Sequence, residues 1–432
     1  SLAERQRTLL DDQRAYLRSI HPAIQMSEPC ARALMEKGLT SPAIALYEKG
    51  GKESDIIDRK SGLQSIHKFD MNHGVLKNGL TSLPKEIGRL RKLETLNIAN
   101  GELVELPDSI IHLESLSSLE IYNCPKMEKF PTHIGELPLL RSVNIANNKQ
   151  WSSEEIFAGF EALTNGASKE KIQILYARQN NLKELPESFR NMVKIGLIDL
   201  AFNQISKIYP LGKSVSPVQL YLDFNQLESL PTDSEGYFCG YADSEAFSVK
   251  YNRLKKVPNI FSAKSNSALT SVDFSGNDID GFEGEEDGTY RGIKVETFTL
   301  AQNPKLTKYP LALAKTNSTV AYIILRGCSI NEIPKGSFEY ENSIYMTSID
   351  LSYNKLKDLP KDFHSGNIPY LYGLDLSYNR FTIHPFEQFD MAGLTVFALR
   401  GQRNANGERC LNEWPTGVYQ HVGLRGLYLG SY

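Results

Sequence analysis

The twelve residues IDLSYNKLKDLP at positions 349–360 return almost unchanged at positions 374–385, where the chain reads LDLSYNRFTIHP. Both copies fit the template L-x-x-L-x-L-x-x-N-x-L-x-x-L-P, in which other apolar residues can replace leucine. The template recurs along most of the chain, with 22 to 32 residues between successive starts. A phrase that recurs at this period indicates a structural unit that is stable only when several copies stack. The copies start at Ile66, Leu93, Leu116, Leu140, Ile172, Ile195, Pro217, Ser244, Leu269, Val295, Val320, Met346, Leu371, Leu394 and Leu424.

The first part of each copy predicts a short β-strand. Apolar residues at template positions 4 and 6 alternate with polar residues at positions 3, 5 and 7, the period of a strand with one buried face. One such strand cannot bury that face alone, so the copies should stack into a parallel sheet along a solenoid. The asparagine at position 9 lies inside the core, where its amide can bond the backbone of adjacent copies. This predicted asparagine ladder comprises Asn148, Asn180, Asn203, Asn225, Asn252, Asn277, Asn303, Asn354 and Asn379.

Two copies carry cysteine at the ladder position, Cys124 and Cys328. A reactive or metal-binding thiol is one interpretation. The other is that cysteine, being small and readily buried, simply fills the ladder position. The stretch QNPKLTKYP at 302–310 favours the second interpretation, because it has the same expanded form with Asn303 in place of the thiol. The five cysteines are widely spaced without a C-x-x-C pair, so we expect neither a disulfide nor a zinc site.

The rest of each copy predicts turns or short helices on the outer, convex side. Segments such as SLPKEIGRLRKL place proline at a first helical position and apolar residues three or four apart. The insertion at 151–171 also has helical spacing, with Ile156, Phe157, Phe160 and Leu163 on one face. Together these features resemble the leucine-rich repeat. The predicted fold class is α/β, a leucine-rich repeat solenoid curved into a horseshoe with a parallel inner sheet.

The repeat divides the chain into two parts. Residues 1–65 do not match the template and read as helices, which we interpret as an N-terminal cap; a separate partner-binding module is the alternative. Residues 66–432 form an array of about 14 full units plus a truncated last one. Because the last unit stops after its strand portion, we expect a further segment to cover that apolar end.

Composition and motifs indicate a binding protein without a cofactor or metal. The net charge of -3 gives no reason to expect nucleic acid as a partner, and no apolar run is long enough to span a membrane. Neither G-x-S-x-G nor H-E-x-x-H occurs, and LGKS at 211–214 lacks the upstream glycine of a phosphate-binding loop. The acidic residues between 283 and 287 lack the alternating spacing of a calcium loop, so we expect a solvated loop there.

Several stretches are more specific than the generic repeat. IYNCPKMEKFP at 121–131, KIQILYARQNNLKELP at 171–186 and GQRNANGERCLNEWP at 401–415 resemble secreted leucine-rich repeat proteins of gut Bacteroidetes. The resemblance implies export, often with a lipid anchor at the cell surface, and no known catalysis. A cytoplasmic location is the alternative.

The middle copies carry the residue types that dominate binding energy at protein interfaces. Leu197, at template position 3, is expected to be exposed by the same count. Position 8 has a second interpretation, because its aromatic rings can pack on one another as a spine, as we expect for Tyr353 and Tyr378. The predicted partner-binding residues are Tyr176, Arg178, Asp199, Tyr221, Asp223 and Lys250 at positions 5 and 7, and Phe202, Phe224 and Tyr251 at position 8.

The predicted function is a non-enzymatic, monomeric scaffold whose concave surface binds a protein or peptide. Exposed aromatic residues beside Asp and Arg also suit sugar rings, so a carbohydrate-binding surface protein is the alternative. A weaker third hypothesis is an enzyme whose site lies in the loops at 232–243 and 403–410.

Overall fold

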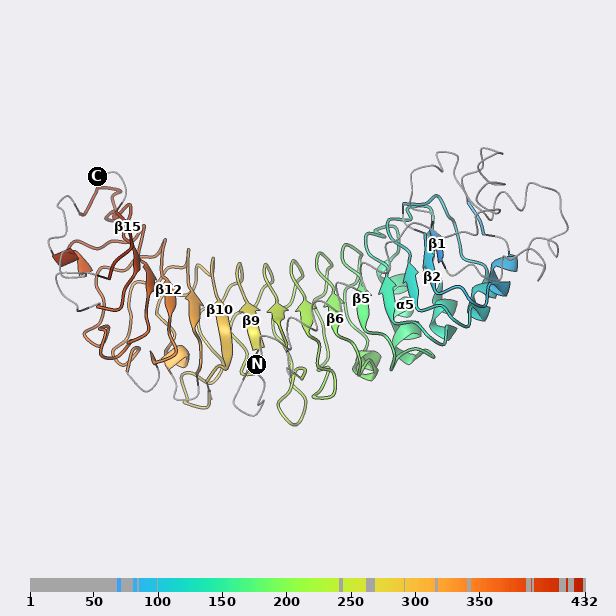
Figure 1. The fold of residues 1–432 in the computed structure, drawn as a ribbon, viewed down its shortest axis with the longest axis horizontal. Helices are drawn as coiled ribbons and strands as arrows, with labels where there is room; N and C mark the ends of the chain where they lie inside the picture. Colours follow the sequence, from blue (N-terminus) through green and yellow to red (C-terminus); the bar gives the residue numbers. More distant parts are fainter. Residues whose placement is uncertain are drawn as a thin grey trace. The chain divides into compact units, whose positions relative to one another are not determined.

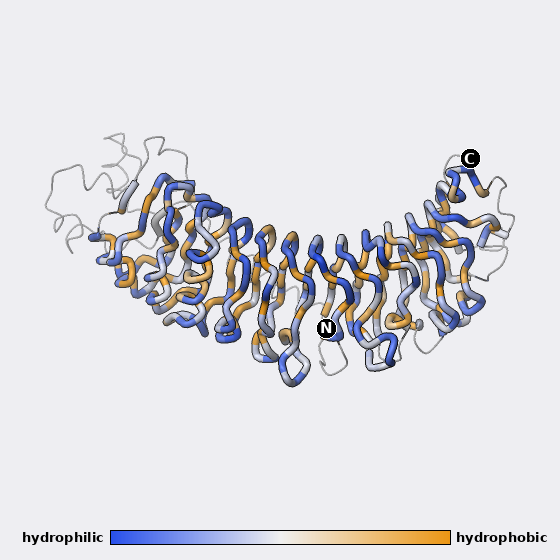
Figure 2. The backbone as a smooth tube through the Cα atoms, turned by 180° about the vertical axis from the view of Figure 1, so that it is seen from behind, coloured by the Kyte–Doolittle hydropathy of each residue, from blue (hydrophilic) through white to orange (hydrophobic). Residues whose placement is uncertain are grey.

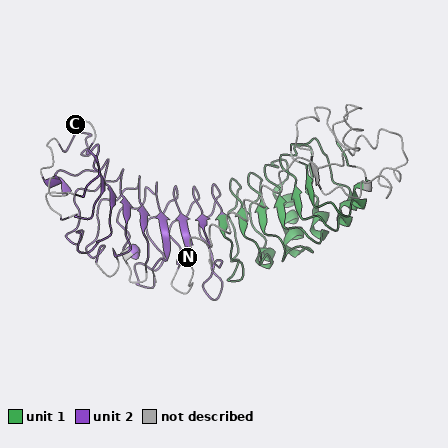
Figure 3. Cartoon of the chain, in the orientation of Figure 1, with its two compact units in different colours: residues 1–220 green, residues 221–432 purple. Residues whose placement is uncertain are grey.

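A computed structural model describes most of the repeat array, and the predicted N-terminal helical segment lies outside the described residues. The chain divides into two compact units, residues 1–220 and residues 221–432 (Figure 3). The described residues are 68–70, 81–83, 85–98, 100–240, 244–261, 269–290, 292–314, 318–339, 343–385, 390, 392–411, 417–418 and 423–429.

In the first unit, each template copy forms one strand that pairs in parallel with the strand of the next copy. The register is constant: Leu119 lies beside Val143, and Val143 lies beside Leu175. Equivalent template positions therefore form continuous rows across the sheet, as the repeat predicts. The strands are β1 (Lys68–Asp70), β2 (Thr95–Asn97), β3 (Ser118–Glu120), β4 (Ser142–Asn144), β5 (Ile174–Tyr176) and β6 (Leu197–Asp199) (Figure 1).

The helical segments predicted after the ladder positions are present in this unit. The insertion forms α5 (Ser153–Asn165), whose first turn is capped by the Ser152 hydroxyl accepting a hydrogen bond from the Glu155 N–H. Ile156, Phe160 and Leu163 are buried as predicted, while Phe157 is half-buried. The other segments are short 3-10 helices: η2 (Lys85–Arg89), η3 (Asp108–His112), η4 (Thr132–Glu136) and η5 (Glu187–Asn191).

The second unit follows the same parallel scheme with fewer helices. Where the structure describes them, its outer segments run mostly as turns joined by isolated parallel bridges, such as the one between Lys308 and Glu332, and they include the short helix η6 (Leu311–Ala314). β7 (Gln219–Tyr221) lies where the two units divide. The remaining strands are β8 (Ala246–Ser248), β9 (Leu269–Asp273), β10 (Val295–Thr299), β11 (Tyr322–Ile324), β12 (Ser348–Asp350), β13 (Gly373–Asp375), β14 (Val396–Ala398) and β15 (Gly426–Tyr428).

Apolar side chains at the strand positions form the core of each unit. Along the tube, apolar and polar stretches alternate in step with the repeat (Figure 2). In the second unit Phe247, Phe274 and Phe298 succeed one another inside the core, with ring centroids 6.0 and 6.1 Å apart. Each ring covers the next, so no copy buries its apolar face without its neighbours. The solenoid predicted from the repeat is confirmed.

The asparagine ladder is also confirmed. Asn354 Nδ2 donates to the carbonyl oxygens of Leu325 at 2.8 Å and Leu351 at 3.0 Å, and its Oδ1 accepts from the Ile330 N–H at 2.9 Å. One amide thus ties its own turn to the preceding copy. The sequence missed one member, Gln402, whose side chain donates to Leu376 O and accepts from the Phe381 N–H.

Both ladder cysteines fill the structural role. Cys124 Sγ donates to Ile98 O at 2.9 Å, and Cys328 Sγ donates to Leu300 O at 3.2 Å. Burial raises the pKa of each thiol to about 11, so neither supplies a thiolate near neutral pH. Of the other cysteines, Cys239 and Cys410 lie in the described residues and form no disulfide there, whereas Cys30 lies outside them.

Candidate binding surface

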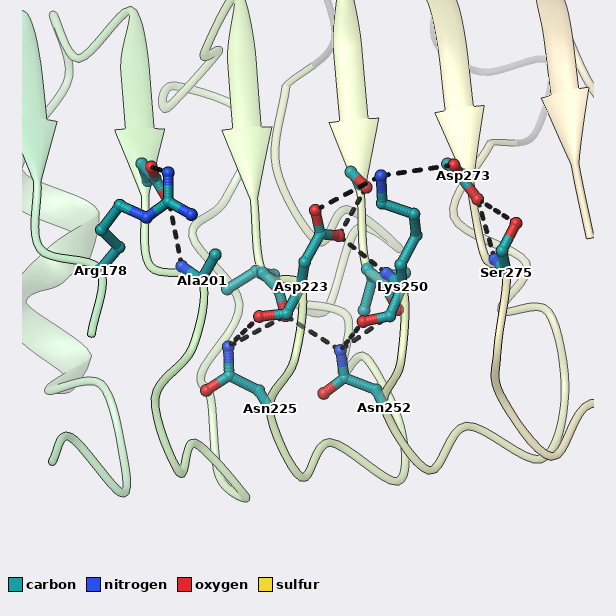
Figure 4. A network of polar contacts seen from close by, with 12 residues as sticks. Arg178, Ala201, Asp223, Asn225, Lys250, Asn252, Asp273 and Ser275 are labelled. Carbon is teal, nitrogen blue, oxygen red and sulfur yellow. Dashed lines mark hydrogen bonds and ion pairs between the residues drawn. The ribbon is translucent and has the colours of Figure 1, made fainter. Parts of the chain in front are cut away.

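In the first unit, the predicted binding residues gather at the ends of β5 and β6. Arg178 Nη1 lies 3.6 Å from Asp199 Oδ2, and its Cζ lies 5.4 Å from the centre of the Phe202 ring. Asp199 is only 7% exposed, and its Oδ1 accepts a hydrogen bond from the Ala201 N–H (Figure 4). Burial raises the pKa of Asp199, while the Ala201 N–H and Arg178 act in the opposite direction. The aspartate therefore fixes the turn and orients the guanidinium, whose side chain stays 44% exposed.

In the second unit, Lys250 lies between two carboxylates. Its Nζ is 3.9 Å from Asp223 Oδ2 and 3.8 Å from Asp273 Oδ2 (Figure 4). Asp223 is 9% exposed because its Oδ1 accepts hydrogen bonds from the Ser248 hydroxyl at 2.5 Å and the Lys250 N–H at 2.8 Å. Burial raises the pKa of Asp223, opposed by the Ser248 hydrogen bond and by Lys250. Lys250 is thus held in place, and Tyr221 lies half-buried on β7.

Template position 8 forms what we call the left-handed column, because its described residues have φ between 51° and 70°. Bulky residues rarely adopt this conformation. The backbone is held by the next copy: the Tyr353 N–H, for example, donates to Ser377 O at 2.8 Å. The column comprises Asn100, Asn123, Asn147, Gln179, Phe202, Phe224, Tyr251, Gly276, Gln302, Gly327, Tyr353, Tyr378 and Gly401.

Side chains of the left-handed column pack on one another. Phe224 stacks on Tyr251 with ring centroids 4.6 Å apart. The Tyr251 ring in turn lies over Gly276, where an added Cβ would approach it to 2.4 Å, and its hydroxyl donates to Gln302 Oε1 at 2.9 Å. These contacts favour the spine interpretation for Phe224 and Tyr251, although the two residues stay 40% and 42% exposed.

The prediction that Leu197 is exposed is wrong, since only 8% of it is accessible. It lies in register with Ile174, which is also buried, so two apolar side chains at the start of adjacent strands shield each other. Asp199 and Asp223 are likewise too buried to offer a carboxylate to a partner. Of the predicted residues at positions 5 and 7, Tyr176 and Arg178 in the first unit and Tyr221 and Lys250 in the second therefore remain accessible. At position 8, exposed residues are Phe202, Phe224 and Tyr251.

A tyrosine-rich surface lies in the second unit, and the predicted packing of Tyr353 on Tyr378 within it is confirmed. The hydroxyls of Tyr322 and Tyr372 lie 3.4 Å apart. Tyr353 and Tyr378 stack with centroids 4.2 Å apart, and Arg326 Cζ lies 4.4 Å from the centre of the Tyr353 ring. The sequence did not predict the contact between Tyr322 and Tyr372, at template positions 3 and 2, because only the register shows that these two side chains meet.

The acidic loop binds its own backbone. Glu285 accepts hydrogen bonds from the Phe282 and Ala312 N–H groups, and Asp287 Oδ1 accepts from the Thr289 N–H. Within the described ranges, no group of three or more potential ligands from His, Cys, Asp or Glu is placed to hold a metal ion. Among those same residues, no helix is long and apolar enough to cross a membrane.

Comparison with known proteins agrees with this geometry. A family described as a leucine-rich repeat region matches residues 74–232. A solved leucine-rich repeat protein from Bacteroides eggerthii is 34% identical and superposes with a TM-score of 0.74, over 82% of this chain and 62% of that one. The chain has the leucine-rich repeat fold. A second solved leucine-rich repeat protein, from Bacteroides thetaiotaomicron, is also 34% identical, with a TM-score of 0.73 over 82% of this chain and 45% of that one.

Curated relatives are more distant. Lumican from Rattus norvegicus is 24% identical over 249 residues, which cover 51% of this chain and 62% of lumican. The chain spans about three fifths of the length of the lumicans it matches. The shared repeat architecture supports a protein-interaction scaffold, because stacked repeats create extended surfaces suited to binding.

Proposed function

We propose that this protein is a non-enzymatic scaffold that binds a protein or peptide through outward residues of its strands and the turns that follow them. The proposal rests on the way in which neighbouring aspartates orient two cationic side chains. Arg178 and Lys250 each keep an exposed charged end, and each is oriented by a nearly buried aspartate. A pre-oriented side chain loses less conformational entropy on binding than a free one.

Each unit offers one anchor pair. In the first unit the pair is Tyr176 and Arg178, and in the second it is Tyr221 and Lys250. Aromatic residues and arginine recur among the side chains that dominate interface energies, where they fill pockets on the partner. The two pairs are tested separately.

The test starts from a partner captured by the wild-type protein and purified. We expect Tyr176→Ala and Tyr221→Ala each to weaken its affinity by about 2 kcal/mol, roughly 30-fold, because hot-spot side chains lose at least that much on truncation. Tyr370→Ala is the matched control, since Tyr370 is 66% exposed, more than any other large apolar residue that the structure describes, and belongs to neither pair. Unchanged affinity in both variants, with far-UV circular dichroism like the wild type, excludes these anchors.

A carbohydrate ligand is the second candidate, favoured by the tyrosine-rich surface. Asp350 and Asp375 lie side by side on β12 and β13, while Tyr322 begins β11 and Tyr372 immediately precedes β13. Tyrosine faces suit sugar rings, and carboxylates accept hydrogen bonds from sugar hydroxyls. A glycan array separates the candidates: a carbohydrate function requires saturable retention that Tyr372→Ala abolishes and Tyr370→Ala preserves.

We further propose that the protein acts as a monomer on the outer surface of a bacterial cell, held there by a lipid anchor. Its likeness to leucine-rich repeat proteins of Bacteroides supports this location. Protease treatment of intact producing cells should degrade the protein, and a fatty-acid label should enter it. Full protection of the protein in intact cells, but not in lysed ones, would place it in the cytoplasm instead.

A further inference from the structure

A pocket of about 210 Å³ lies in the second unit, in a part of the surface that the proposed scaffold function does not use. The turns that follow β13 and β14 form this pocket together with the loop at 403–410. The enzyme hypothesis from the sequence placed its site partly in that loop. Its lining residues are Tyr378, His384, Leu399, Arg400, Gly401, Gln402, Arg403, Arg409, Leu411 and Leu429.

The lining is strongly cationic. It contains three arginines, Arg400, Arg403 and Arg409, and no aspartate or glutamate. Within the described part of the chain, no carboxylate forms an ion pair with any of the three, whereas Lys250 and Lys256 in the same unit each face two. Three guanidinium groups around one pocket repel one another unless an anion lies between them.

Side-chain contacts orient two of the arginines, Arg400 and Arg403, without using up their donors. Arg400 Cζ lies 4.7 Å from the centre of the Tyr428 ring. Arg403 Nη1 donates to Gly407 O at 2.6 Å, and a backbone bridge pairs Arg403 with Arg409 across the loop. A guanidinium has five N–H donors, so most remain available to a ligand.

Hydrogen bonds and side-chain packing define the loop and the floor of the pocket. Asn404 Oδ1 accepts from the Asn406 and Glu408 N–H groups, which closes the turn around Gly407. Below it, Gln402 is buried, and its amide bonds the preceding copy twice, accepting from the Phe381 N–H and donating to Leu376 O. The Tyr378 ring lies against Gly401, where an added Cβ would approach it to 2.6 Å.

We propose that this pocket binds an oxyanion, the sulfate, phosphate or carboxylate group of a small ligand such as an acidic sugar. Guanidinium groups match the geometry of these anions and bind them with paired hydrogen bonds. The volume is below the range of roughly 300–1,000 Å³ typical of pockets for drug-sized ligands, so it suits one anionic group with a small body.

The test is isothermal titration of the whole protein with sodium sulfate, sodium phosphate or sodium glucuronate, in a constant chloride background. We expect saturable binding of at least one anion at a single site. The three titrants distinguish a tetrahedral oxyanion from a carboxylate. Absence of saturable binding for all three overturns the proposal.

Variants then locate the site. Arg403→Gln and Arg409→Gln should each raise the Kd for the anion about tenfold, the size expected for one lost charge-assisted hydrogen bond. Arg425→Gln is the matched control, because Arg425 is an exposed arginine of the same unit outside the pocket lining. Binding that survives both pocket variants, or that falls equally in Arg425→Gln, would assign the anion to general surface charge and refute the site. Far-UV circular dichroism like that of the wild type is required of every variant.

Discussion

Replacing Asn354 with alanine tests the ladder directly. The substitution removes three short hydrogen bonds in a site that is only 7% exposed. The Ile330 N–H is left without its acceptor, at a cost of about 1–3 kcal/mol, and each lost bond to the carbonyls of Leu325 and Leu351 adds roughly 0.5–1.5 kcal/mol. A water molecule can enter the space and recover part of this. We therefore expect a loss of about 3 kcal/mol in the free energy of unfolding.

Urea unfolding followed by far-UV circular dichroism measures this loss, provided that the dependence on urea concentration keeps the wild-type slope. Asn331→Ala is the matched control, because Asn331 is an exposed asparagine of the same unit and should change stability by less than about 0.5 kcal/mol. Asn354→Asp distinguishes donor from acceptor. Its carboxylate can still accept from the Ile330 N–H but would face two carbonyl oxygens, so it should destabilise at least as much as alanine at pH 7. Equal stability of the Asn354→Ala and Asn331→Ala proteins would refute the ladder as a source of stability.

Three further predictions follow from the same contacts. The buried thiols of Cys124 and Cys328 should resist a thiol reagent in the native protein at pH 7, and all five cysteines should titrate as free thiols after denaturation; fewer than five would reveal a disulfide. Burial raises the pKa of Asp199 in the folded state, so its protonation stabilises the protein below about pH 4 and this contribution is lost as pH rises through the raised pKa. Asp199→Asn should flatten that part of the stability profile measured by urea unfolding between pH 3 and 7, and an unchanged profile would contradict the shift. Gly276→Ala should cost about 1–3 kcal/mol more in unfolding free energy than Gly288→Ala, because both glycines have positive φ but only the first has a ring where its Cβ would lie; equal costs would show that the ring moves freely.

The sequence predicted the strands and the ladder because both depend on local, periodic features. Apolar alternation places one strand in each copy, and a buried asparagine has few roles besides bonding the turn. Gln402 was not predicted as a ladder member because the template allowed only asparagine or cysteine at that position. A glutamine amide nevertheless carries the same donor and acceptor on a longer side chain.

The binding surface was harder to predict because exposure depends on neighbouring copies. Template counting placed Leu197 and Asp199 outward, yet the first is covered by an apolar neighbour and the second by its own turn. The contact between Tyr322 and Tyr372 joins residues 50 positions apart, and only the stacking register brings them together. The lining residues of the arginine pocket likewise come from three copies and a loop, so no single stretch of sequence predicted the pocket.

The left-handed column constrains how this array can change during evolution. A ring at one copy occupies the space of the Cβ at the next, as Tyr251 does at Gly276 and Tyr378 does at Gly401. Where glycine follows a ring in this way, the two neighbouring copies should therefore be inherited as a matched pair. Deleting the copy that carries Gly276 would place Gln302 directly after Tyr251, so the ring would meet a Cβ instead of open space. Gain or loss of repeats should accordingly proceed by pairs at such places, and single copies should be exchanged only where the column carries asparagine.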